Sequence, residues 1–136
     1  MDRKISENNY SPTILIVRDS GEKIEFDSSI LADFNTVYVS KSKDRSILGW
    51  IQENQPDLII LELRNPQESC CCLITPLRLD WLTRNIPIIV IGDRFTLKSI
   101  ANLDYDVCLR SPCSETDLDG AICSLISTSL CQTHVS

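Results

Sequence analysis

Five short runs of apolar and mostly β-branched residues recur along the chain, and they constrain its fold more than any other feature. Runs of this length and composition predict buried strands. Because several of them are apolar at consecutive positions, they favour a parallel sheet that is covered on both faces. The runs are residues 13–17 (TILIV), 36–40 (TVYVS), 57–63 (DLIILEL), 87–91 (PIIVI) and 105–109 (YDVCL).

The segments between these runs carry apolar residues at helical spacing. Pro76 is expected to kink or divide the third of the resulting helices, because proline cannot donate a backbone hydrogen bond. Ser114 and Asp117 resemble a capping box at the start of the last one. We expect the helices within residues 21–34, 42–54, 69–85, 96–103 and 114–130.

Strands that alternate with helices predict right-handed β-α-β units, and five strands suit the flavodoxin-like order 2-1-3-4-5. The expected fold is an α/β three-layer sandwich around a five-stranded parallel sheet. The sequence has 136 residues, enough for one such domain. We place this domain at residues 12–131, between a flexible N-terminal segment at 1–11 and a tail at 132–136.

The charge of the chain argues against several partners. The formal net charge is −6, and no run of Lys and Arg offsets the repulsion from nucleic-acid phosphates. No apolar run approaches the ~20 residues of a membrane span. Residues 1–11 are polar and lack the apolar centre of a signal peptide. We therefore expect a cytoplasmic protein that binds neither nucleic acid nor membrane.

Seven cysteines suggest metal or redox chemistry, but their spacing contains no metal-ligand pattern. Cys70, Cys71 and Cys72 are adjacent, and adjacent residues on a helix point in different directions. The one histidine, His134, lies in the tail. We expect no metal site and mostly buried thiols that act as small hydrophobic groups. A redox role of the cluster at 70–72 is the alternative.

The sequence also lacks the residues that nucleotide binding and Ser-His-acid catalysis require. The chain contains no glycine-rich loop that could hold nucleotide phosphates. One histidine cannot complete a Ser-His-acid set together with the scattered serines and acids. We therefore expect no enzyme activity and no cofactor.

The strand segments resemble those of response-regulator receiver domains, the CheY-like family. PDLIILEL at 56–63 is similar to the third receiver strand, and Pro66 follows at the distance where the family has a proline after its phosphorylated aspartate. The resemblance covers about residues 13–130 and implies the same fold. The other matching segments are ILIV before Arg18 and Asp19, IPIIVIGD at 86–93 and LRSPC at 109–113.

Receiver domains accept phosphate on an aspartate, while two acids hold Mg²⁺ and a hydroxyl and a lysine bind the phosphoryl group. The resemblance implies that this site is degenerate here. Glu62 stands at the acceptor, Arg18 and Asp19 at the acidic pair, Gly92 at the hydroxyl and Ser111 at the lysine. We expect Arg18 to pair with Asp19 and Glu62 and so replace the charge of the ion. The alternative is that Arg18 points into solvent.

The resemblance implies a pseudo-receiver, a phosphorylation-independent signalling module that docks a partner protein. Such domains occur in atypical response regulators and circadian-clock proteins. The partner would be a histidine kinase, or a clock or transcriptional regulator component, and a homodimer is a further option. Two alternatives stay open: a redox or quinone sensor that uses the cysteines at 70–72, and an active receiver that accepts phosphate on Glu62. The family's usual contact face would here include Lys98, Asn102, Arg110, Asp119 and Cys123.

Overall fold

The sheet of the protein has five strands in the order β2-β1-β3-β4-β5, and every neighbouring pair is parallel. This confirms the predicted architecture and strand order. The computed structural model describes residues 12–18, 29–40, 47–64, 70–111 and 113–134. The strands are β1 (Thr13–Arg18), β2 (Asn35–Ser40), β3 (Leu58–Glu62), β4 (Ile88–Gly92) and β5 (Val107–Arg110).

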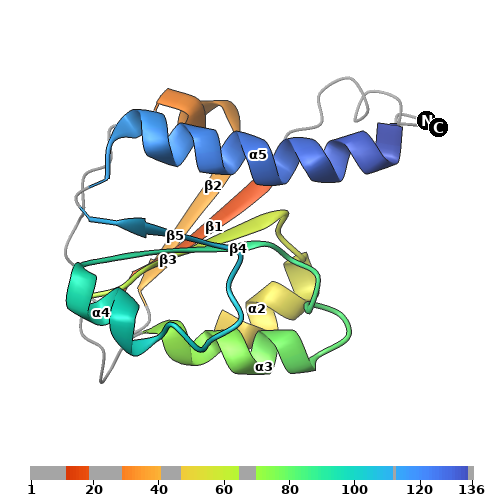
Figure 1. The fold of residues 1–136 in the computed structure, drawn as a ribbon. Coiled ribbons are helices and arrows are strands. Elements are labelled where there is room, and N and C mark those ends of the chain that lie inside the picture. The colour runs from red at the N-terminus through yellow and green to blue at the C-terminus, as the bar shows by residue number, and fades with distance from the viewer. Residues whose placement is uncertain (1–11, 19–28, 41–46, 65–69, 112, 135–136) are drawn as a thin grey trace.

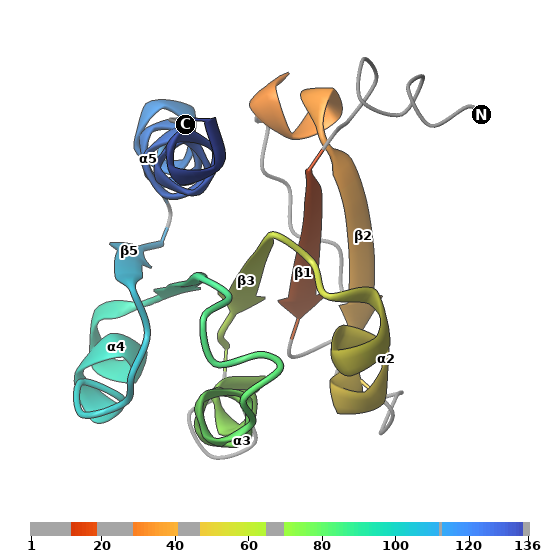
Figure 2. The ribbon, with the colours of Figure 1, turned by 90° about the vertical axis from the view of Figure 1, so that its right-hand side faces the viewer.

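Helices lie on both faces of the sheet, so the molecule has three layers (Figure 1, Figure 2). One face is covered by α2 (Ile47–Asn54), α3 (Ile74–Leu79) and α4 (Arg94–Ser99). The 3-10 helix η1 (Ser29–Asp33) and the long helix α5 (Glu115–His134) lie on the other face. A second 3-10 helix, η2 (Cys70–Leu73), leads directly into α3.

Two hydrophobic clusters enclose the central strands. Side chains of a strand alternate between faces, so Ile14 packs with α5 while its neighbour Leu15 packs with α2 and α3. Every residue of β3 and β4 is buried. Burial on both faces explains why these strands are apolar at consecutive positions. It also makes the buried polar residue at the end of β3, Glu62, unusual.

The segment predicted as one helix over 69–85 is divided. The 3-10 helix η2 passes into α3 at Ile74, and Pro76 lies in the first turn of α3, where a missing N–H costs little. The expectation that this helix continues to residue 85 is wrong. At Asp80 the backbone is extended, and the Asp80 carboxylate accepts a hydrogen bond from the Leu82 N–H at 3.0 Å. This local bond replaces the next helical turn.

The other helix boundaries follow from their caps. The Asp93 carboxylate accepts a hydrogen bond from the Thr96 N–H at 2.8 Å, so α4 begins at Arg94, before the predicted start. The Ser114 hydroxyl accepts from the Asp117 N–H at 3.0 Å, which confirms the predicted cap of α5. Of the helix expected over 21–34, residues 21–28 lie outside the described residues. Within the described ranges, no helix is both long and apolar enough to cross a membrane.

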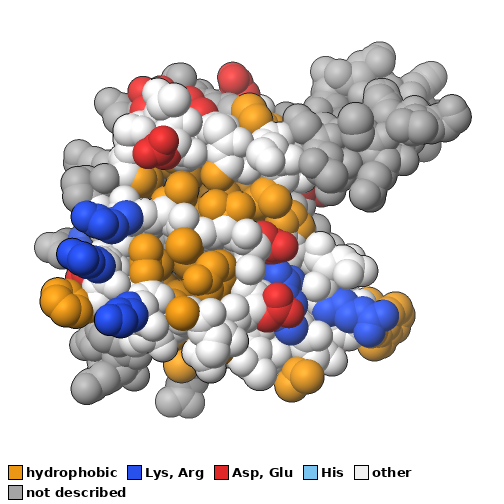
Figure 3. Space-filling view, viewed as in Figure 1, with side chains coloured by type: hydrophobic (Ala, Val, Ile, Leu, Met, Phe, Trp, Pro, Cys, Tyr) orange, Lys and Arg blue, Asp and Glu red, His pale blue; other side chains and the backbone are white. Residues whose placement is uncertain are grey.

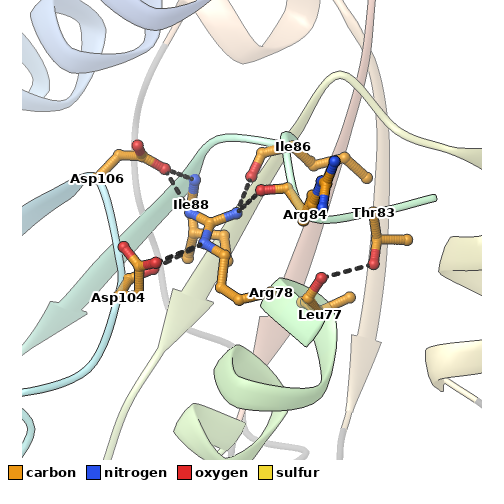
Figure 4. Close-up of polar contacts among 8 residues, drawn as sticks. All are labelled: Leu77, Arg78, Thr83, Arg84, Ile86, Ile88, Asp104 and Asp106. Carbon is orange, nitrogen blue, oxygen red and sulfur yellow. Dashed lines mark hydrogen bonds and ion pairs between the residues drawn. The ribbon is translucent and has the colours of Figure 1, made fainter. Parts of the chain in front are cut away.

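One arginine, Arg78 of α3, joins three segments at the amino-terminal edge of β4 and β5 (Figure 4). Its side chain is only 14% exposed, and its guanidinium meets both backbone carbonyls and a carboxylate. It thereby fixes α3 against the segments that enter β4 and β5. The hydrogen bonds run from Nε to the Asp104 carbonyl (2.9 Å), from Nη1 to the carbonyls of Arg84 (2.9 Å) and Ile86 (2.8 Å), and from Nη2 to the Asp106 carboxylate (2.8 Å).

Candidate functional site

The candidate site lies where β1 and β3 end side by side. The strand register places Arg18, the last residue of β1, opposite Glu62, the last residue of β3. In a sheet of this order, the chain reverses its direction of winding between these two strands, and the resulting crevice is where such folds place their sites. Gly92, the last residue of β4, lies opposite Arg110 of β5.

Arg18 and Glu62 form an ion pair. The Nε group of Arg18 donates a hydrogen bond to Oε1 of Glu62 at 3.1 Å. The Arg18 side chain is 15% exposed and the Glu62 side chain 2%. The predicted pairing of these two residues is therefore present, and the alternative of a solvent-directed Arg18 is wrong. Asp19, the expected third member, lies outside the described residues.

Tyr38 of β2 also contacts the Arg18 guanidinium. The Cζ atom of Arg18 lies 4.7 Å from the centroid of the Tyr38 ring, within the range of a cation–π contact. Tyr38 pairs with Ile16, two residues before Arg18, so both side chains lie on the α5 face of the sheet. Sequence reasoning missed Tyr38. The alternation of the strand places it on this face, but no motif marks it.

The two further positions that the receiver resemblance singled out, Gly92 and Ser111, are joined through the backbone. The Ser111 N–H donates to the Gly92 carbonyl at 2.8 Å, and the Ser111 side chain is exposed. A Cβ atom at Gly92 would lie 3.4 Å from the Cβ of Leu63 and from the Cγ2 of Thr96, at the near edge of ordinary contact. Gly92 has no hydroxyl, and neither Gly92 nor Ser111 carries a positive charge.

Cys113 is a second neighbour of the site that sequence reasoning missed. Burial raises the pKa of its thiol, and the negative charges of Asp117 and Glu62 raise it further. A thiol with a raised pKa stays protonated near neutral pH, and the protonated thiol is a poor nucleophile. Cys113 is therefore suited to packing beside Glu62 and not to covalent chemistry.

The described donor set does not fit Mg²⁺. This ion requires several oxygen ligands at short distance, but one oxygen of Glu62 is engaged by the Arg18 guanidinium. Among the described residues, no group of three His, Cys, Asp or Glu side chains gathers where it could hold a metal ion. The described partner of Glu62 Oε1 is therefore a cationic side chain, whereas a metal site would need a further acidic side chain.

The described cysteines of the 70–72 cluster do not converge on a common surface. Cys71 is buried in the core beneath α2 and α3, whereas Cys72 is exposed. The Cys70 side chain lies outside the described part of the structure. These two thiols thus have opposite environments, and Cys72 is the one of them that is open to an oxidant. The expectation of mostly buried thiols is wrong for the described cysteines, because Cys72, Cys108 and Cys123 are exposed.

Three elements, α4, β5 and α5, lie side by side on the face shown in Figure 1 and Figure 3. Figure 3 shows hydrophobic side chains between α5 and β5 and again between β5 and α4, with basic side chains at the rim. The predicted contact residues lie on these elements or on the turn after α4. Lys98, Asn102, Arg110 and Cys123 are exposed, and Asp119 is half-buried.

Comparisons with known proteins agree with this architecture. No family model and no curated protein matches the chain. Among solved structures, it is similar to the signal receiver domain of a histidine kinase from Syntrophus aciditrophicus (TM-score 0.72, 24% identity, 87% of this chain and 92% of that chain). It is also similar to the receiver domain of the response regulator AraT from Geobacillus stearothermophilus (0.64, 19%, 90% and 98%). A third similar structure is the chemotaxis regulator CheY4 of Vibrio cholerae (0.61, 15%, 85% and 98%).

These similar structures show that the chain has the receiver fold. They cover most of its length, and the sheet order is that of the flavodoxin-like class. At these identities the likeness concerns the fold alone.

Proposed function

We propose that this chain is a pseudo-receiver, a signalling module with the receiver fold that docks a partner protein without accepting phosphate. The partner would be a signalling protein such as a kinase or regulator component. The proposal includes neither an enzymatic role nor a metal or cofactor.

The observation that carries the proposal is the ion pair between Arg18 and Glu62. An acceptor carboxylate needs both a bound cation to offset the phosphoryl charge and space for the incoming group. Glu62 is instead 2% exposed and already bonded to a fixed guanidinium. Gly92 has no hydroxyl and Ser111 has no positive charge, so neither supplies the group that receivers have at that position.

We expect the protein to take up no label from radioactive acetyl phosphate in the presence of Mg²⁺, because Arg18 already neutralises Glu62. Isothermal titration should likewise show no Mg²⁺ binding in the millimolar range. An active receiver domain treated in parallel provides the positive control. Label that is incorporated by the wild type and lost in Glu62→Gln would contradict the proposal and support an active receiver.

The docking surface is proposed to be the face formed by α4, β5 and α5. It combines apolar side chains that are only half-buried, such as Val107 and Leu109, with the exposed cations Lys98 and Arg110. Interfaces of this kind have an apolar centre and a polar rim. Cations on this rim are notable because the whole chain carries a net charge of −6.

Reversing the charge of Lys98 and Arg110 together to glutamate should lower partner binding at least about tenfold, since rim charges set encounter and register. The measurement is quantitative capture of interacting proteins from native extract, identified by mass spectrometry. Because both side chains are exposed, the thermal stability should change little. The matched control is Arg84→Glu, an exposed arginine in the turn between α3 and β4. Equal loss in the control would place the docking surface elsewhere.

A further inference from the structure

The strand β2 forms one outer edge of the sheet (Figure 2). Half of its backbone groups face away from β1. The Asn35 N–H donates to the Pro12 carbonyl at 3.0 Å, so Asn35 faces β1. Successive residues of a strand point their N–H and C=O groups to opposite sides in turn. Thr36, Tyr38 and Ser40 therefore direct their N–H and C=O groups outward, away from the sheet.

Within the described residues of β2, this edge carries none of the side chains that usually prevent pairing with another strand. Natural edge strands carry charged residues, proline or bulges that prevent such contacts. The sequence of β2, NTVYVS, contains no charge, no proline and no glycine. Its six residues stay in continuous register with β1. The opposite edge strand, β5, is shorter and carries Arg110.

Tyr38 adds an exposed aromatic surface to this edge. Its side chain is 48% exposed although its ring lies against Arg18. The strand thus offers hydrogen-bonding groups and apolar side-chain area together, which are the two components of strand addition.

We propose that two copies of this chain associate through antiparallel pairing of their β2 strands, which joins the two sheets into one. In the register centred on Tyr38, each Tyr38 lies opposite the Tyr38 of the second copy. Thr36 then lies opposite Ser40, and Val37 opposite Val39. The outward-facing residues meet one another, so the pair forms about six backbone hydrogen bonds.

A second copy fits this edge for two reasons. Every cross-strand pair in this register is uncharged, so two chains of equal net charge meet without direct repulsion at the contact. The exposed carboxylate of Asp33 lies just before the strand. An antiparallel arrangement keeps the two copies of this carboxylate at opposite ends of the contact, whereas a parallel one would bring them side by side.

Pairing at β2 leaves the opposite side of the sheet open. The strand order places β5 at the far edge from β2, so the proposed dimer would carry two copies of the α4, β5 and α5 face. This inference does not depend on the proposed docking function, and the two can fail separately.

Sedimentation equilibrium of the full chain at about 0.15 M salt, where charges beyond about 8 Å are screened, tests the proposal. The wild type should show a monomer–dimer equilibrium. Tyr38→Lys should raise the dissociation constant at least about tenfold, because two cations would then lie directly opposite each other. The matched control, Cys108→Lys, introduces the same charge at an exposed position of the other edge strand and should leave the dimer unchanged. A wild type that is monomeric throughout, or a dimer broken only by Cys108→Lys, overturns the proposal.

A second variant keeps the test valid if lysine disturbs the contact with Arg18. In Tyr38→Cys the two introduced thiols would have Cα atoms about 5.5 Å apart, which suits a disulfide. In Thr36→Cys the equivalent atoms would be about 14 Å apart, because they lie four residues apart along the strands as well as on different strands. Mild oxidation should therefore cross-link the first variant and not the second, with the link mapped by peptide mass spectrometry because the chain has seven cysteines of its own. Equal cross-linking of both variants, or of neither, contradicts the proposed register.

Discussion

Replacing Arg18 with alanine is expected to lower the free energy of unfolding by about 2–4 kcal/mol, because removing one member of a buried ion pair leaves the other charge desolvated. Glu62 is 2% exposed and receives the Arg18 Nε hydrogen bond at 3.1 Å. The substitution also removes the contact of the guanidinium with the Tyr38 ring. Urea unfolding followed by circular dichroism measures the change.

The double variant Arg18→Ala with Glu62→Gln should recover much of this loss, since the buried charge disappears together with its partner. A double-mutant cycle of the two substitutions gives their coupling energy directly. Arg110→Ala is the matched control, because Arg110 is an exposed arginine at the end of β5 and should change stability by no more than about 0.5 kcal/mol. If Arg18→Ala changes the free energy of unfolding as little as Arg110→Ala does, the ion pair does not stabilise the fold. The idea that Arg18 takes the place of a metal ion beside Glu62 would then have no energetic support.

A charge reversal at the same position separates electrostatics from packing. Arg18→Asp should be less stable than Arg18→Ala, because it places a carboxylate beside Glu62. Part of its loss should return with millimolar Mg²⁺, since the change restores an acid at the place where receivers hold the ion. Stability that is insensitive to Mg²⁺ in this variant would mean that the remaining geometry cannot bind the metal.

Replacing Arg78 with alanine should cost about 3 kcal/mol, because it removes several charge-assisted hydrogen bonds from a largely buried guanidinium. The bonds reach three backbone carbonyls and the Asp106 carboxylate, which also accepts from the Ile88 N–H at 2.8 Å (Figure 4). Arg78→Lys should recover little, since a single ammonium cannot reproduce the planar fork. Thermal unfolding by calorimetry measures both variants.

The control for this prediction is Arg84→Ala. Arg84 contributes only its backbone carbonyl to the cluster, and its side chain is exposed. Removing that side chain should therefore stay within about 0.5 kcal/mol. A similar loss for Arg78→Ala and Arg84→Ala would show that general surface charge, and not the hydrogen-bonded cluster, is responsible.

The strand order could be predicted because each strand is marked by its own apolar run, and the burial of β3 and β4 on both faces requires such runs. The pairing of Arg18 with Glu62 followed from that order, because neighbouring strands bring their last residues together. The end of α3 at Asp80 could not be predicted in the same way. There the carboxylate and the carbonyl of Asp80 accept hydrogen bonds from backbone N–H groups of the following turn, and these local bonds outweigh a continuing apolar pattern.

Two contacts had no motif to mark them in the sequence, one at the candidate site and one at the amino-terminal edge of β4 and β5. The contact between Arg18 and the Tyr38 ring is diagonal, because Tyr38 pairs with Ile16 and not with Arg18. The two strands follow each other in the chain, but a long connection separates them. The Arg78 cluster depends on backbone carbonyls, which carry no residue-type signature. Sequence patterns report side-chain polarity, so contacts to main-chain oxygens are not visible to them.

The ion pair at the end of β1 and β3 has a consequence for how this site responds to its surroundings. A metal ion or phosphoryl group occupies a site in proportion to its supply and leaves by dissociation or hydrolysis. The Arg18 guanidinium is attached to the same chain as Glu62, so its effective concentration there is set by the fold and not by the solution. Displacing the arginine from Glu62 would therefore require the binding energy of another molecule, one that binds better to the site in which the ion pair is open.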